Sequence, residues 1–272
     1  MSLARFLDRV PDAERSLVVV NRTGPDALAQ MMQSTFEHQS VDIEERDVPD
    51  AEDDLVLLVE DDEVVATSPF EALQRTILFV NSDLYRTGTQ GIETLDLPAV
   101  LTHLDDVRFS LRAYPQSHKE KLLLIAISRY IEQVAWRAAG GRIRASFQSL
   151  SRLEDEVGTR RVYQTLADSP VDTHVYGVPD WVPPESFDVT MHGGYSRDFT
   201  DSWFVVFRPD EEPDASASAA GQRDASVPSP DGAAVGPVAL LALEDDPGLW
   251  DGFWTFDADL AADVERYIMR EL

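Results

Sequence analysis

The sequence predicts an α+β (mixed α/β) fold: a small N-terminal α/β unit, then a sensor-type module with an antiparallel sheet flanked by helices. Two observations lead to this class. Short β-branched runs alternate with helical spacing over residues 1–80. Beyond residue 116 the predicted order is helix, strand, helix, four strands and helix, which is typical of a sheet covered by a layer of helices.

The first 80 residues contain enough elements for a unit of their own. Pro25 and Pro69 each stand at the first turn of an expected helix, where proline costs little. The acidic run 60–63 separates two apolar runs and predicts a hairpin turn. The expected helices are 2–10, 25–38 and 68–80, and the expected strands are 16–21, 41–45, 55–59 and 64–67.

Residues 81–116 are expected to connect the two units. A polar loop that contains glycine covers 81–88, and a short helix covers 98–105. The loop offers Asn81, Asp83 and Tyr85 as polar groups that could reach a site.

The module over 117–272 begins with the clearest element of the chain, a helix over 117–139. Ser117 and Glu120 form a capping box at its start, and Gly140-Gly141 is a stop signal. Its apolar residues cover more than one face, so we expect the helix to lie between layers. The remaining expected elements are strands 142–148, 173–178, 189–193, 203–207 and 238–243, and helices 150–166 and 259–272. Residues 209–237, rich in Ala, Ser, Asp, Pro and Gly, are expected to be a flexible insertion.

Charge and cysteine content exclude several function classes. The 272 residues carry a formal charge of −27, which disfavours direct nucleic-acid binding. The absence of cysteine excludes disulfides and thiolate chemistry. Only two of the 23 basic residues are lysines, and this acidic, lysine-poor composition favours a halophilic protein. No signal peptide and no membrane-spanning run is evident, so we expect a cytoplasmic protein.

No familiar catalytic or metal-binding motif is present. The five histidines have no metal-site spacing, and His192-Gly-Gly194 has no Gly-x-Ser-x-Gly partner. No glycine-rich phosphate loop occurs. The acidic runs fit a solvated surface better than a calcium loop. We therefore expect no catalytic residues and no metal, and the sequence names no cofactor.

A polar stripe on helix 117–139 is the strongest candidate site. Arg129, Glu132 and Trp136 share one side of the helix. They fit either an internal ion pair with tryptophan packing or the wall of a ligand pocket. Trp203 and Trp254 belong to an aromatic-rich C-terminal third, where 249–257 looks like a turn-like segment that could line a site or fill a core.

Several short stretches resemble one known family. They are residues 81–88, 128–137, 146–148, 174–180, 201–207 and 252–257. In this order they are similar to the DICT sensory domain family of diguanylate cyclases and two-component systems, chiefly over residues 70–272. The resemblance implies a signal-input module with a suggested link to light responses. It implies no known ligand and no catalytic residue.

We therefore expect a non-enzymatic sensory module that binds a small ligand or a signalling protein partner and relays its state by conformational change. Two alternatives stay open: an enzyme with a carboxylate–arginine site, and a purely structural interaction protein. A closed pocket that contains Arg129 and Glu132, with a shifted carboxylate pKa, would favour the enzyme.

Overall fold

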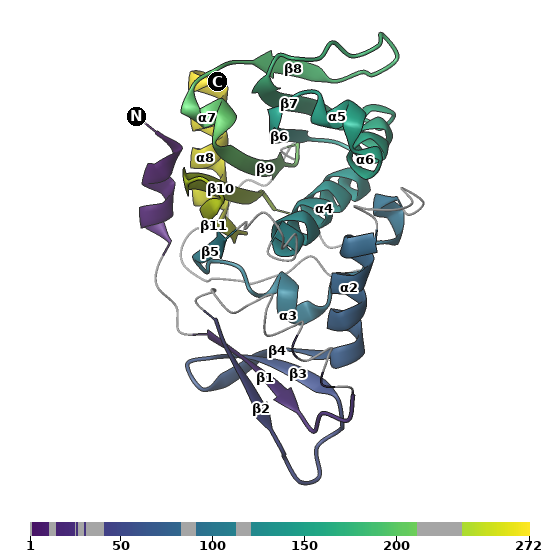
Figure 1. Ribbon diagram of the computed structural model, residues 1–272, viewed down its shortest axis with the longest axis vertical. Helices are drawn as coiled ribbons and strands as arrows, with labels where there is room; N and C mark the ends of the chain where they lie inside the picture. Colours follow the sequence, from purple (N-terminus) through teal and green to yellow (C-terminus); the bar gives the residue numbers. More distant parts are fainter. Residues whose placement is uncertain are drawn as a thin grey trace, which may run out of the picture.

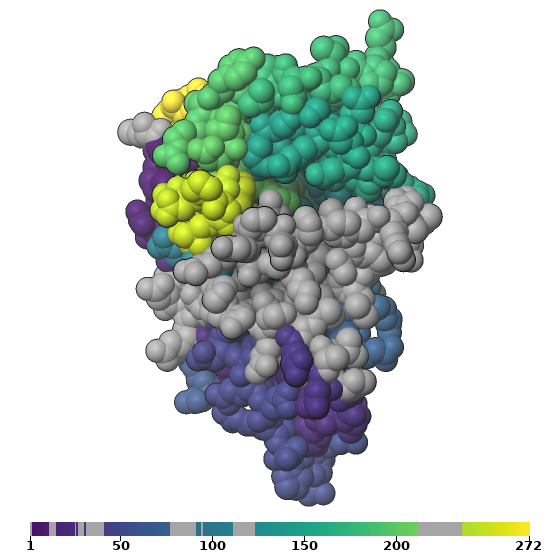
Figure 2. Space-filling model, in the orientation of Figure 1, coloured from purple at the N-terminus to yellow at the C-terminus, as the bar shows by residue number. Residues whose placement is uncertain are grey.

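The computed structural model describes residues 2–10, 15–24, 26, 30, 41–82, 91–112, 121–210 and 236–272. Two sheets organise these segments, and the predicted α+β class is confirmed. Figure 2 shows the segments of the small sheet, purple to blue, at one end of the molecule and the teal to yellow segments at the other. None of the helices in the described segments has the length and apolarity needed to span a bilayer.

The small sheet has the strand order β2-β1-β3-β4. Its strands are β1 (Arg15–Val20), β2 (Val41–Arg46), β3 (Leu55–Glu60) and β4 (Glu63–Pro69). Strands β1 and β2 are parallel, and the other pairs are antiparallel. The expected acidic hairpin is present: Asp61 and Asp62 both have positive φ, as a tight two-residue turn requires. Helix α2 (Phe70–Ser82) follows and includes Asn81, so the predicted loop begins later than expected.

The large sheet has the order β5-β11-β10-β9-β6-β7-β8. Its strands are β5 (Phe109–Arg112), β6 (Arg142–Ser149), β7 (Asp172–Val178), β8 (Thr190–Gly193), β9 (Ser202–Arg208), β10 (Val238–Asp246) and β11 (Leu249–Thr255). The expectation of an antiparallel sheet is wrong at one edge, where β6, β7 and β8 run parallel. The helices between β6 and β7 return the chain to the starting edge, which makes these two strands parallel.

Both faces of the large sheet are covered. Val205 and Leu240 belong to the core on one face, while Phe204 and Leu241 belong to the core on the other. Continuous apolar strands of this kind are expected where a sheet is buried on both sides. Helix α4 (Lys121–Ala138) covers the first face, and α8 (Ala258–Glu271) covers the second together with η1 (Leu3–Arg9) (Figure 1). Although η1 opens the chain, it lies beside α8 and away from the small sheet.

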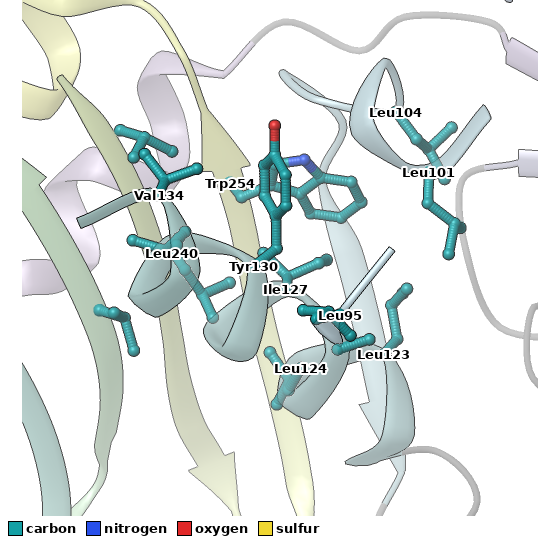
Figure 3. Packing of buried hydrophobic residues seen from close by; sticks show 14 of the residues in the cluster. Leu95, Leu101, Leu104, Leu123, Leu124, Ile127, Tyr130, Val134, Leu240 and Trp254 are labelled. Carbon is teal, nitrogen blue, oxygen red and sulfur yellow. The ribbon is translucent and has the colours of Figure 1, made fainter. Parts of the chain in front are cut away.

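Helix α4 lies between layers, as its apolar pattern predicted. Figure 3 shows Val134 of α4 near Leu240 of the sheet, and Ile127 on another side of the helix toward Leu95. The last helical residue is Ala138, and Gly141 follows with φ +87. A Cβ on Gly141 would lie 2.5 Å from the carbonyl oxygen of Arg208, so the glycine that ends the helix also allows the end of β9 to pack closely against it. The capping box at 117–120 lies outside the described residues.

Two further elements differ from expectation. The helix predicted over 150–166 is broken at Glu156 into α5 (Arg152–Asp155) and α6 (Val157–Ala167). The aromatic segment 249–257, expected as a turn, contains strand β11, because Trp250 and Trp254 alternate with Phe253 between the two cores. Short elements η3 (Ile92–Thr94), α3 (Ala99–Thr102) and α7 (Arg197–Thr200) complete the described fold. The expected helix 25–38 and the insertion 209–237 lie mostly outside it.

Candidate functional site

A cavity of about 380 Å³ lies where α4 and the α5–α6 pair meet strands β6 and β9. This volume lies within the range of small-molecule sites. Apolar surface predominates in its wall, and a smaller polar set interrupts it. The lining residues are Ile125, Ser128, Arg129, Glu132, Ala145, Ser146, Phe147, Gln148, Arg152, Glu156, Thr159, Tyr163, Trp203 and Val205.

A chain of charged and polar groups crosses one wall of the cavity. Arg129 Nη1 donates to Glu132 Oε2 at 2.7 Å, and Arg129 Nη2 donates to Thr159 Oγ1 at 3.0 Å. The Thr159 hydroxyl in turn donates to Glu156 Oε2 at 3.0 Å. Arg129 and Glu132 are one helical turn apart on α4, so their spacing brings them together, whereas Thr159 and Glu156 come from the next helical segment.

The carboxylate of this network is deeply buried. Only 3% of the Glu132 side chain is exposed, against 12% for Arg129. Burial raises the pKa of Glu132, and the Arg129 guanidinium and the Tyr163 hydroxyl oppose that rise. Burial, followed by the Glu132 charge, raises the pKa of Tyr163 well above its usual value. The Tyr163 hydroxyl lies close enough to Glu132 to act on its pKa, but it makes no well-formed hydrogen bond with any described residue.

Strand β6 is irregular where it lines the cavity. Its pairing with β7 shifts register between Ser146 and Ser149, which marks a bulge. Gln148 within the bulge has φ 54, a left-handed conformation that is unfavourable for a residue with a side chain. Its side-chain amide donates to the carbonyl oxygen of Ser202 and holds the bulge against β9. The bulge allows Ser146, Phe147 and Gln148 all to line the cavity.

Aromatic side chains form the flat parts of the wall. The indole Nε1 of Trp203 donates to Ser128 Oγ at 3.0 Å, which fixes the ring beside α4. The Phe147 and Tyr163 rings pack edge to face at 5.0 Å. Hydrogen bonding and ring packing therefore hold all three rings in place before any ligand arrives.

The structure brings three of the eight proposed site residues together. Arg129, Glu132 and Trp203 all line the cavity. Trp136 is partly buried against the core and does not line it.

The other proposed residues lie elsewhere. Trp254 lies in the core beside Tyr130 and is 3% exposed (Figure 3). Asn81 is in helix α2, while Asp83 and Tyr85 lie outside the described residues.

Sequence reasoning missed most of the polar wall. Tyr163 and Thr159 lie on a helix that looks ordinarily amphipathic, and Arg152 precedes its break. The stretch 146–148 was noticed only through the family resemblance, although its bulge is the most unusual part of β6.

A second polar cluster lies at the β7–β8 edge of the large sheet. His174 Nδ1 lies 2.9 Å from His192 Nε2, and His174 Nε2 lies 3.0 Å from Asp172 Oδ2. Burial lowers the pKa of His192, with His174 and Arg144 acting in the same direction. In the described residues, no three His, Asp or Glu side chains are grouped so that they could hold a metal ion.

Residues 99–219 match one family model, DICT, described as a sensory domain in diguanylate cyclases and two-component systems. The predicted resemblance is thus confirmed over these residues, a narrower range than expected. All the residues that line the cavity fall inside the matched segment. No curated protein and no solved structure matches the chain significantly. The segment that resembles this sensory domain family therefore contains the whole lining of the cavity.

Proposed function

We propose that the DICT sensory domain of this chain works by binding a small molecule in the cavity between α4, α5–α6, β6 and β9. The sensory role comes from the family, and the cavity is the feature of the described structure best suited to receive a signal. The relay would be a conformational change passed to another protein by contact, which makes a signalling partner part of this proposal.

The observation that carries the proposal is the combination of a preformed volume with an unsatisfied buried group. Arg129 donates to both Glu132 and Thr159, and these two hydrogen bonds hold the polar wall in place. Tyr163 is fully buried, yet its hydroxyl makes no well-formed hydrogen bond with a described residue. Buried hydroxyls without partners are rare because they cost free energy, and a ligand acceptor would remove that cost.

The arrangement of the wall supports a relay. Ser128 and Arg129 come from α4, Thr159 and Tyr163 from α6, and Trp203 from the sheet. A ligand that contacts all three would change the spacing between the two helices and the sheet. Gln148 has a strained left-handed conformation, so a change of backbone geometry at this point of β6 would relieve strain.

A catalytic cavity is the second candidate, because burial raises the pKa of Glu132 in its wall. Two hydroxyl groups of the wall already take part in hydrogen bonds, however. Ser128 accepts from Trp203, and Thr159 joins Arg129 to Glu156. Ser128 donates to no general base among the described residues. Thr159 does donate to the Glu156 carboxylate, but its oxygen also accepts from the Arg129 guanidinium, which makes it a poorer nucleophile. We therefore favour binding without turnover, which predicts that a bound compound is recovered chemically unchanged.

The cavity also argues against a purely structural protein, for which we expected no cavity and one exposed apolar patch. A link to light responses would require a ligand that absorbs visible light in this cavity. The absorbance spectrum of the purified chain tests that part of the proposal. We propose the cytoplasm as its location, on sequence grounds alone.

The proposal is tested with substitutions that fill the cavity with a larger side chain. Ile125 is half-buried and lines the cavity, so Ile125→Phe places a larger ring in the ligand volume. Val157→Phe is the matched control, since Val157 is 65% exposed and does not line the cavity. The small-molecule fraction of cells that produce the chain is added to each protein, and the unfolding temperature is measured.

The fraction should raise the unfolding temperature of the wild type and of Val157→Phe, but not that of Ile125→Phe. Ala145→Leu, which fills the cavity from β6, should behave like Ile125→Phe. Equal shifts in all four proteins, or no shift in any, would contradict binding in this cavity. A compound consumed during incubation would favour the enzyme instead.

A further inference from the structure

The cavity contains two kinds of polar group, those already bonded and those still free. Arg129, Glu132 and Thr159 are bonded to one another, and Ser128 to Trp203. Arg152 lines the cavity and is half-buried, but its guanidinium has no ion pair or hydrogen bond with any described residue. The second group is the fully buried Tyr163 hydroxyl, which lies near Glu132 but makes no well-formed hydrogen bond with any described residue.

Both free groups can donate hydrogen bonds. A guanidinium has only donors, and a protonated phenol donates one. The pKa of Tyr163 is raised well above its usual value, so the hydroxyl keeps its proton near neutral pH. A ligand with acceptor atoms would satisfy both donors, while the two carboxylates of the wall, Glu132 and Glu156, already accept from Arg129 and Thr159.

The setting of Arg152, which has no partner in the part of the chain that the structure describes, is unusual. The chain carries a formal charge of −27, so acidic partners are abundant. The nearest turn offers one in Glu156, but that carboxylate accepts from Thr159 instead. An arginine at the wall of a cavity, without a partner among the described residues, is placed to bind an anionic group such as a carboxylate or a phosphate.

The rings define the other half of the ligand. Phe147, Tyr163 and Trp203 present aromatic surface, and each is held in position by packing or by a hydrogen bond. Such walls favour a flat, largely apolar body. The volume of about 380 Å³ leaves room for a ring system of two or three fused rings.

Resting on the function proposed above, we infer that the ligand is a planar ring compound that carries one anionic group, with Arg152 as its counter-ion and Tyr163 as a donor to the ring system. Arg152 then decides specificity for the acid over its neutral counterpart, while the aromatic wall decides specificity for the ring.

The test compares acids with neutral counterparts that share the same ring. FMN is paired with riboflavin for a phosphate, and indole-3-acetate with indole-3-acetamide for a carboxylate. Binding to the full chain is measured by calorimetry for the wild type and for Arg152→Gln. Arg160→Gln is the matched control, because it removes the same charge from α6 at a residue that does not line the cavity.

At least one acid should bind the wild type about tenfold more tightly than its neutral counterpart, the effect expected of one charge-assisted contact. Arg152→Gln should abolish that preference without weakening the neutral compound, and Arg160→Gln should retain it. The pair that shows the preference identifies the anion as phosphate or carboxylate.

No preference in either pair, or a preference that survives Arg152→Gln, would overturn the inference. The small-molecule fraction of the producing cells shows whether only this inference fails or the proposed function fails as well. If its stabilising component is not retained by an anion exchanger, the cavity binds a ligand that is not an acid. If no component stabilises the wild type, the proposed function itself is wrong.

Discussion

Replacing Tyr163 with phenylalanine tests most directly whether the cavity is built for a ligand. The change removes one oxygen and leaves the ring that packs against Phe147 at 5.0 Å. Tyr163 is fully buried, and its hydroxyl has no well-formed hydrogen bond among the described residues. In the free protein the buried hydroxyl therefore lowers the free energy of unfolding, and this loss is partly offset because the hydroxyl stabilises the buried Glu132 carboxylate.

The magnitude follows from these opposing effects. A buried hydroxyl without a partner costs about 1–3 kcal/mol, and the gain from stabilising a nearby carboxylate is of similar size. Their near cancellation predicts that Tyr163→Phe changes the free energy of unfolding by less than about 1 kcal/mol. Binding of the preferred acid should weaken by about tenfold, because the ligand loses a donor.

Urea denaturation followed by tryptophan fluorescence measures the stability, and calorimetry with FMN or indole-3-acetate measures the affinity. Tyr130→Phe is the matched control. Its hydroxyl is also buried without a hydrogen bond to a described residue, but Tyr130 does not line the cavity. The control should leave the affinity unchanged.

A different outcome would refute the reasoning. A loss of about 2 kcal/mol or more in Tyr163→Phe, with unchanged affinity, would mean that the hydroxyl is a structural donor to Glu132. Glu132→Gln would then lower the stability by a comparable amount, and the two changes would not be additive.

Three further predictions concern the rest of the chain. Burial raises the pKa of Asp105 from 3.8 to about 6, so the charged carboxylate destabilises the folded state at higher pH. Asp105→Asn should therefore raise the free energy of unfolding in urea by on the order of 2 kcal/mol at pH 8. This gain should disappear as the pH falls from about 6 to 3.8. Phe207 and Val238 are paired across β9 and β10, so replacing residues 211–235 by a short Gly-Ser turn should leave the unfolding temperature nearly unchanged; a large decrease would show that the segment packs on the domain. Because 27 excess negative charges repel one another, circular dichroism should show loss of native signal at low salt and recovery at molar salt, where the Debye length is about 3 Å. An unfolding midpoint that does not change with salt would contradict the halophilic interpretation.

The sequence by itself determined the elements whose signal is local. Helix α4 was predicted from its apolar spacing and its stop signal, and the hairpin at Asp61-Asp62 from the acidic turn between apolar runs. Arg129 and Glu132 could be paired in advance, because residues three apart on a helix are neighbours. The family resemblance likewise depended on short stretches in a fixed order.

Only the tertiary structure decided what depends on segments meeting across the fold. Nothing local distinguishes Tyr163 from an ordinary core tyrosine, since its lack of a partner depends on α4, α6 and β6 together. The same holds for Arg152, because the sequence does not show that the nearby Glu156 accepts from Thr159 and that Arg152 has no partner among the described residues. Trp203 and Trp254 look alike in sequence, yet one lines the cavity and the other fills the core, because their strands present them to different neighbours. Periodicity determines which face of an element is buried, whereas packing between distant segments determines whether that face meets another side chain or an empty volume.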